Sequence, residues 1–154
     1  EDQRNDYIRD ILETAGYDVK DQTRRGLSPS GKAAGEVDIL IKNKNFPVTI
    51  IEALNLTSLN TRYLDNHIDK IYGYDTAGNA FNTILSYVAV SDFVGFCNKY
   101  IEHIKGYKYP FKIISVEENV VIDKVSYSDI KVIKTVHNRN GSETVLYHIC
   151  VLIK

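Results

Sequence analysis

Two short stretches, GEVDILIK at 35–42 and PVTIIEAL at 47–54, decide which fold this sequence predicts. Both are rich in β-branched and apolar residues, which is typical of strands, and the polar residues 43–45 between them predict a tight turn. If the strands pair antiparallel around that turn, residues whose numbers sum to about 89 or 90 lie opposite each other, so Asp38 faces Glu52. Two carboxylates are then expected roughly 5 Å apart on one face of a hairpin.

Side chains alternate between the two faces of a strand, so Leu40 and Ile50 are expected on the same face as the two acids. We expect the other face to point into the core, through Val37, Ile39, Ile41, Ile51 and Ala53. Like charges directly opposite each other destabilise a sheet unless a cation neutralises them. The acid pair therefore indicates either a divalent metal site or two carboxylates on a solvent-exposed sheet face.

The rest of the chain supplies helices and further strands in a clear order. Apolar residues at helical spacing predict helices over 4–15, 60–74 and 93–106. Extended patterns predict strands at 17–22, 83–90, 111–116 and 119–125, and a hairpin of 131–136 with 144–153. We therefore expect a single α/β domain with a mixed central sheet flanked by helices, its core spanning about 4–116 and a C-terminal strand extension about 117–154.

Composition limits the classes of function. The 154 residues suffice for one core, and the net charge of -1 gives no general attraction to nucleic acid, so any binding of a polyanion needs a local basic patch. The two cysteines have no metal-ligand spacing, and there is no signal peptide or apolar run of membrane-spanning length. We expect a cytoplasmic protein without a membrane partner and, since the sequence contains no methionine, a piece of a longer chain.

The segment GLSPSGKA at 26–33 almost matches a phosphate-binding P-loop. The spacing GxxxxGK is met, but Ala33 stands where a magnesium-binding hydroxyl is needed, and a strand is predicted to follow where the motif requires a helix. Binding of ATP is therefore a distant third hypothesis. The favoured alternatives are that Arg24, Arg25 and Lys32 contact phosphates of a nucleic acid, or that they are simply solvated.

The order helix, three strands, helix, strand, helix, with Asp38 in GEVDILI and Glu52 in IIEAL, resembles the core of the PD-(D/E)xK nuclease superfamily. The resemblance covers roughly the first two-thirds of the chain. It implies a restriction-endonuclease-like αβββαβ core that cleaves phosphodiester bonds in DNA or RNA, with Mg²⁺ or Mn²⁺ held by Asp38, Glu52 and the carbonyl group of Ala53. The segments GKAAGEVDI and HIDKIYGYDTAGN also resemble nuclease-like domains attached to bacterial defence NTPases.

The chain departs from the superfamily pattern at Leu54, where a lysine is expected. Nuclease chemistry needs a cation near that point to orient water and to stabilise the charge that grows on the phosphate. Superfamily members are known to move this lysine to another element. On the predicted helix 60–74, Lys70 shares a stripe with His67, so we expect Lys70 to replace the lysine and His67 to contact the scissile phosphate or to carry protons.

Two alternatives to these roles remain open. Lys70 lies beside an apolar stripe, and lysines in such positions often extend to water without any function. Lys32, at the end of the basic loop, is the second candidate for the missing lysine.

The sequence thus supports two main hypotheses of different classes. The first is a magnesium-dependent nuclease acting on nucleic acid, with DNA favoured and a homodimer suited to cutting both strands. The second is a catalytically inactive module of the same fold that binds a protein partner or nucleic acid, which Leu54 and the low net charge favour.

Overall fold

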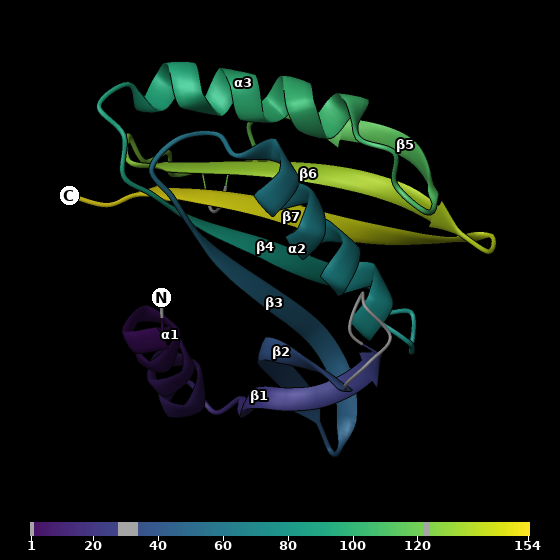
Figure 1. Ribbon diagram of the computed structural model, residues 1–154. Helices are drawn as coiled ribbons and strands as arrows, with labels where there is room; N and C mark the ends of the chain where they lie inside the picture. Colours follow the sequence, from purple (N-terminus) through teal and green to yellow (C-terminus); the bar gives the residue numbers. More distant parts are fainter. Residues whose placement is uncertain (1, 28–33, 122–123) are drawn as a thin grey trace.

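The computed structural model describes residues 2–27, 34–121 and 124–154 (Figure 1). The helices in this part are α1 (Asp2–Thr14), α2 (Thr61–Tyr74) and α3 (Phe93–Gly106). The strands are β1 (Asp18–Leu27), β2 (Ala34–Asn43), β3 (Phe46–Leu56), β4 (Phe81–Val88), β5 (Lys112–Glu117), β6 (Ile130–Arg139) and β7 (Ser142–Leu152). None of the described helices combines the length and the apolar character that crossing a bilayer requires.

All seven strands belong to one mixed sheet, in the order β1-β2-β3-β4-β7-β6-β5. Strands β3, β4 and β7 run parallel, and the other neighbouring pairs are antiparallel. Helix α2 connects β3 to the parallel strand β4, as a crossover between parallel strands requires. The α/β class and the mixed sheet predicted from the sequence are confirmed.

The main core lies between the sheet and helices α2 and α3, which cover the same face (Figure 1). Leu40 and Ile50 are fully buried in this core, on the face that also carries Glu52. A smaller apolar cluster around Ala53, Leu85 and Tyr87 lies on the other face, where Ile8 of α1 packs. Both faces of the central strands are therefore buried.

This arrangement corrects the predicted direction of the hairpin. Residues such as Ile51 and Ala53 were expected to face the core, with the acids on the opposite side, but the acids share the face of the main core. On β3 the predicted alternation is confirmed, since Ile50 and Leu54 pack in the main core and Ile51 and Ala53 in the smaller cluster, but Val37 of β2 joins Leu40 in the main core. Alternation alone does not say which face a crossover helix covers. The interpretation with both acids on a solvent-exposed face is wrong, because Glu52 is fully buried.

The strands near the carboxyl end differ from the prediction in two ways. Strand β7 is not an appended extension, because it lies in the sheet between β4 and β6 and pairs with both. Among the described residues of 119–125 no regular strand forms, although the Val120 N–H still donates to the Val132 carbonyl at 3.0 Å. The pairing of β7 with β4 joins segments far apart in sequence, which local patterns do not reveal.

Helix α2 carries one side of the candidate site, and its sequence explains its position. Asn60 caps its first turn by accepting the Tyr63 N–H at 3.1 Å. Leu64, Ile68 and Ile71 recur at helical spacing and are fully buried against the sheet. Their burial fixes the rotation of the helix, so Lys70 on the neighbouring stripe reaches Glu52 of β3.

Candidate functional site

Strands β2 and β3 stop pairing where the two acids lie. Their register pairs Leu40 with Ile50 and Ile39 with Ile51, and it extends no further toward Asp38. Beyond this point each acid binds the backbone of the opposite strand. Asp38 Oδ2 accepts the Ala53 N–H at 2.8 Å, and Glu52 Oε1 accepts the Asp38 N–H at 3.4 Å. The two carboxylates are therefore brought side by side, as the hairpin register predicts.

Glu52 is fully buried and has few partners for a carboxylate in that position. Besides the Asp38 N–H, its Oε2 accepts a hydrogen bond from Lys70 Nζ at 3.3 Å, so both contacts lie at the long end of hydrogen-bond distances. Burial, followed by the charge of Asp38, raises the pKa of Glu52 from 4.5 to about 8, although Lys70 acts in the opposite direction. The position is one where additional positive charge would stabilise the carboxylate.

Lys70 reaches the acids from helix α2. Its side chain is 29% exposed, and its ammonium group lies at Glu52. Burial lowers the pKa of Lys70, but the charges of Glu52 and Asp38 together outweigh burial, so the pKa is raised above its ordinary value. Lys70 thus stays positively charged, and its contact with Glu52 is not expected of a lysine that only extends to water.

The position of the missing lysine is part of the core. Leu54 follows Glu52 by two residues on β3, so its side chain lies on the same face, and it is fully buried among apolar neighbours under α2 and α3. A charged side chain at this position would lose its hydration without gaining a partner. The ammonium group beside Glu52 therefore comes from α2, through Lys70, and the position on β3 is filled by a buried leucine.

His67 lies one turn before Lys70 and is almost completely buried. Its Nδ1 is 2.9 Å from the Tyr63 carbonyl oxygen, and because a carbonyl only accepts, Nδ1 carries the proton and Nε2 has the free lone pair. Its ring packs edge-on against the Tyr63 ring, with centroids 4.5 Å apart. Burial is the main cause that lowers the pKa of His67, so the ring is neutral near neutral pH.

The oxygen atoms at this site suit a hard divalent cation. In the described part of the chain no group of three or more His, Cys, Asp and Glu residues is placed to hold a metal, so the available set is Asp38, Glu52 and a backbone carbonyl. The N–H and C=O groups of one strand residue point to the same edge, and the Ala53 N–H points at Asp38, so the Ala53 carbonyl also faces β2. Two carboxylates and a carbonyl, completed by water or phosphate oxygens, fit Mg²⁺. We call Asp38, Glu52, Ala53 and Lys70 the carboxylate site.

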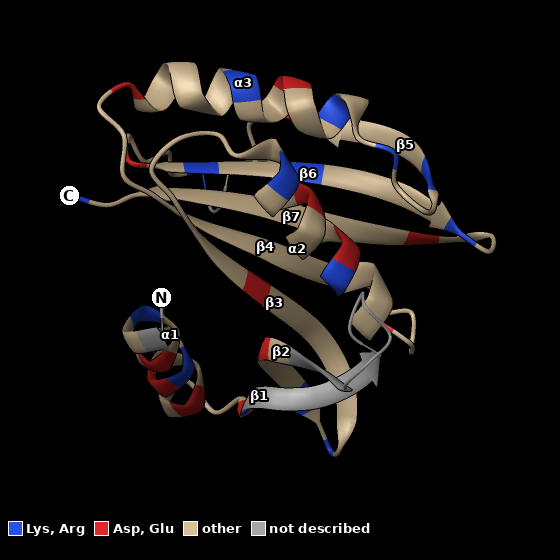
Figure 2. Cartoon of the chain, viewed as in Figure 1, with Lys and Arg blue, Asp and Glu red and all other residues tan. Residues whose placement is uncertain are grey.

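The predicted basic contacts are described only in part. Arg24 and Arg25 belong to β1, in register with Glu36 and Gly35 of β2, which places them on a strand and not in the predicted loop. Their side chains, and all of Lys32, lie outside the described residues. Figure 2 shows acidic and basic residues mixed along α2, so that helix does not offer a uniformly basic surface. The role of the three basic residues in binding phosphate stays a prediction.

A second buried acid, Asp75, was not recognised from the sequence. It follows α2 and accepts hydrogen bonds from the backbone N–H groups of Gly78 and Asn79, from Asn82 Nδ2 and from Arg139. Asn82 Oδ1 in turn accepts the Ile50 N–H of β3 at 3.0 Å. The network ties the end of α2 to β3 two residues before Glu52. The only local signal was the spacing DTAGN, which is typical of an Asx turn.

Comparisons of the chain with protein-family models, with curated proteins and with solved structures found no match. A function is therefore inferred from the residues of the carboxylate site and from their geometry.

Proposed function

We propose that this domain is a metal-dependent nuclease of the PD-(D/E)xK type, which hydrolyses phosphodiester bonds in nucleic acid, DNA above RNA. One observation carries the proposal: the buried Glu52 lies between Asp38 of the neighbouring strand and the ammonium group of Lys70. Two acids and one cation, supplied by β2, β3 and α2, form the minimal set for metal-assisted cleavage of a phosphodiester. A purely structural role does not explain a buried acid with two long contacts.

The carboxylates of Asp38 and Glu52 and the carbonyl of Ala53 are the groups that would hold Mg²⁺ or Mn²⁺. When bound, the ion supplies a Lewis acid that polarises the phosphate and lowers the pKa of the attacking water. The Ala53 N–H fixes the Asp38 carboxylate from one side, which leaves the other oxygen of Asp38 to bind the ion. Glu52 has the Asp38 N–H as its backbone contact, so both acids are oriented before any ligand arrives.

Lys70 acts as a permanent positive charge. Because the two acids raise its pKa, it remains protonated over the physiological range and is not suited to accept a proton from water. It is suited to orient the attacking water and to stabilise the negative charge that develops on the phosphate oxygens. Its position on α2 replaces the missing lysine at Leu54.

His67 is better suited to carry a proton than to bind phosphate. A neutral ring whose Nδ1–H is held by the Tyr63 carbonyl presents only a lone pair at Nε2, which repels a phosphate oxygen but accepts a proton. Of the two roles predicted from the sequence, the geometry thus favours the proton carrier. Arg24, Arg25 and Lys32 complete the proposal as contacts to the nucleic-acid backbone, which would make binding sensitive to salt.

The direct test is a cleavage assay with plasmid DNA, single-stranded DNA and RNA in Mg²⁺ and in Mn²⁺. We expect the protein to cut at least one substrate. Asp38→Asn, Glu52→Gln and Lys70→Met should each lower the rate by about 100-fold or more, the usual scale for the loss of one such group. Lys99→Met, an exposed lysine of α3, serves as the matched control and should cut normally. A Glu52→Gln protein that cuts at the wild-type rate rules out the site.

The inactive-module hypothesis is favoured by one observation, the burial of Leu54 at the position of the superfamily lysine. It is separated from the nuclease by measuring metal binding together with cleavage. A nuclease should bind Mn²⁺ through Asp38 and Glu52 and should also cut. A protein that neither cuts any of the three substrates nor gains thermal stability from millimolar Mn²⁺ is a binding module.

The proposal also includes a biological role for the domain, in bacterial defence. The segments GKAAGEVDI and HIDKIYGYDTAGN resemble nuclease-like domains of bacterial defence NTPases, and on that resemblance we propose that the domain is the effector of such a protein. The expected consequence is that expression of the domain in bacteria damages DNA, and that Glu52→Gln abolishes this damage.

A further inference from the structure

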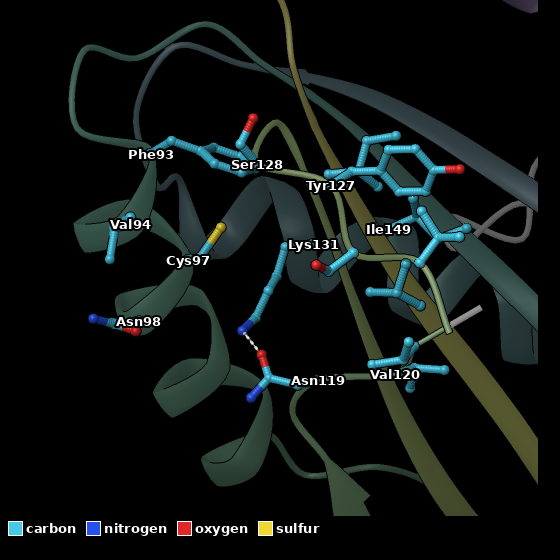
Figure 3. Close-up of a pocket in the computed structure, with 15 residues that line it drawn as sticks. Phe93, Val94, Cys97, Asn98, Asn119, Val120, Tyr127, Ser128, Lys131 and Ile149 are labelled. Atoms are coloured by element: carbon cyan, nitrogen blue, oxygen red, sulfur yellow. Dashed lines mark hydrogen bonds between the residues drawn. The ribbon is translucent and has the colours of Figure 1, made fainter. Parts of the chain in front are cut away.

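A cavity of about 450 Å³ lies between the first half of α3, the segment that follows β5 and the start of β6 (Figure 3). None of the residues that line it belongs to the carboxylate site or contacts it in the described structure. Its volume falls within the range of roughly 300–1,000 Å³ that is usual for small-molecule sites. The cavity therefore needs an explanation separate from the proposed nuclease.

The walls of the cavity are mainly apolar. The apolar side chains that line it include Phe93 and Val94 of α3 together with Val120, Val132 and Ile149. Large apolar side chains at the rim also remain in contact with water: Val94 is 71% exposed and Tyr127 is 59% exposed. Exposed apolar residues are common when scattered, but residues gathered around a hollow mark a binding surface, because an occupant would remove them from water.

The described residues that line the cavity carry only positive charge. Lys131 is the one charged side chain among the described residues that line the cavity, and its Nζ donates a hydrogen bond to Asn119 Oδ1. Three described acids next to the lining in sequence have partners of their own. Asp92 accepts the Gly95 N–H at the start of α3, Asp129 accepts the Ser128 hydroxyl, and Glu118 forms an ion pair with Lys105. A group of negative charge would therefore meet an ammonium and an amide at this point.

We propose that this cavity binds a small amphiphilic carboxylate, whose alkyl or aromatic body lies against the apolar walls and whose acid group binds Lys131 and Asn119. The apolar walls account for affinity, and Lys131 accounts for selection of an anion over a neutral molecule of the same length. The site is independent of the proposed nuclease activity.

Cys97 offers a local probe of the cavity. It lines the cavity from α3, and Figure 3 shows it turned toward the side of β6 that carries Lys131. A hydrogen bond with Cys150 lowers the pKa of the Cys97 thiol, and the charge of Lys131 adds to this effect, although burial opposes it. Both thiols are buried, but Cys97 is among the residues that line the cavity and Cys150 is not, so a thiol reagent that enters the cavity meets Cys97 first. An occupant should therefore slow the modification of Cys97.

The test is a binding titration of the whole chain with decanoate and with 1-decanol, which share a chain length and differ in charge. We expect saturable binding of decanoate, about tenfold tighter than that of decanol, and a matching slowing of Cys97 modification by a maleimide. Lys131→Met should remove the preference for decanoate and leave decanol binding unchanged. Lys134→Met on the same strand carries the same change in net charge, does not line the cavity, and should keep the preference.

A second variant keeps the proposal testable if Lys131→Met fails to fold. Val94 is on the surface of α3, so Val94→Glu is expected to fold normally, as judged by circular dichroism, and to repel decanoate by placing a carboxylate at the rim. The proposal is overturned if decanoate shows no saturable binding, if it leaves Cys97 unprotected, or if the Lys131→Met and Lys134→Met proteins bind it equally well.

Discussion

The described part of the chain contains two buried acids, Glu52 and Asp75, with opposite surroundings. Asp75 accepts hydrogen bonds from Gly78, Asn79, Asn82 and Arg139, all at 2.8–3.1 Å. Glu52 accepts two hydrogen bonds from described residues, at 3.3 and 3.4 Å, and its pKa is raised to about 8, mainly by burial. Both lie on or next to elements that form the carboxylate site, and Asn82 connects the Asp75 network to β3.

The difference separates an acid that builds the fold from one that is available for chemistry. A buried charge surrounded by donors stabilises one arrangement of the chain, whereas a buried charge with incomplete partners is costly until a ligand supplies what is missing. The Asp75 network holds α2 on β3, and that contact places Lys70 beside Glu52. Asp75, which has many hydrogen-bond donors, thus helps to position Lys70 beside Glu52, which has few.

The largest effect is expected from Asp75→Ala, which removes the carboxylate of the network and leaves Arg139 without its ion-pair partner and several buried donors without an acceptor. Breaking a buried ion pair by deleting one partner costs about 3–5 kcal/mol, and we expect a loss of that size in the free energy of unfolding. Urea denaturation measures it. The exposed acid Glu143 provides the control, since Glu143→Ala should change stability by less than about 0.5 kcal/mol. Equal effects of the two substitutions would contradict the structural role of Asp75.

In contrast to Asp75→Ala, Glu52→Gln should increase the free energy of unfolding. In the folded chain the pKa of Glu52 is raised from 4.5 to about 8, so the folded state binds its proton more tightly than the unfolded state, and stability falls as pH rises between these values. Glutamine has no proton to lose, so by pH 8 the variant should be about 2–4 kcal/mol more stable than the wild type. At pH 4.5 the two should be similar. Denaturation curves at both pH values decide this, and a variant that is less stable at pH 8 would exclude the assignment.

The order of the elements and most of their boundaries could be predicted from the sequence, because α2 and α3 have strong apolar stripes and clear caps at Asn60 and Asp92. The placement of Asp38 beside Glu52 followed from the short turn between β2 and β3. The helical spacing that pointed to Lys70 followed from the same local geometry. Each of these features depends on residues close together in the chain.

What could not be predicted depends on contacts between distant segments. The Asp75 network needs Arg139, which is 64 residues away, and no local pattern joins them. The position of β7 between β4 and β6 is equally non-local. The face of the hairpin that carries the acids was assigned wrongly, because both faces of β3 are buried and alternation does not distinguish them.

A smaller effect is expected on metal affinity from Lys70→Met. The ammonium group lies 3.3 Å from Glu52 Oε2, so it repels any cation that shares this carboxylate. Its removal should strengthen Mn²⁺ binding by about tenfold, on the order of 1.4 kcal/mol, while cleavage is lost. Calorimetric titration measures the affinity, with Lys99→Met as the matched control. Weaker binding by Lys70→Met would mean that the lysine supports the metal ligands and does not compete with the metal.

The smallest effect concerns His67. Its pKa is lowered in the folded chain, so its contribution to stability is present above its ordinary value of 6.5 and is lost as pH falls below that value. His67→Gln should remove this contribution. The difference in free energy of unfolding between the variant and the wild type should therefore change between pH 7.5 and pH 5, by less than about 1 kcal/mol. A difference that stays constant over this range would show that the ring does not titrate in the fold.

The central place of β7 also affects the order in which the domain can be assembled during synthesis. Until residues 142–152 have left the ribosome, β4 lacks its partner on one side, and β6 and β5 have no sheet to join. The parallel edge of β4 is then open and apolar, which makes the nascent chain a substrate for chaperones. The sheet that supports β3, and with it the geometry around Glu52, is therefore completed late, after nearly all of the described chain has been translated.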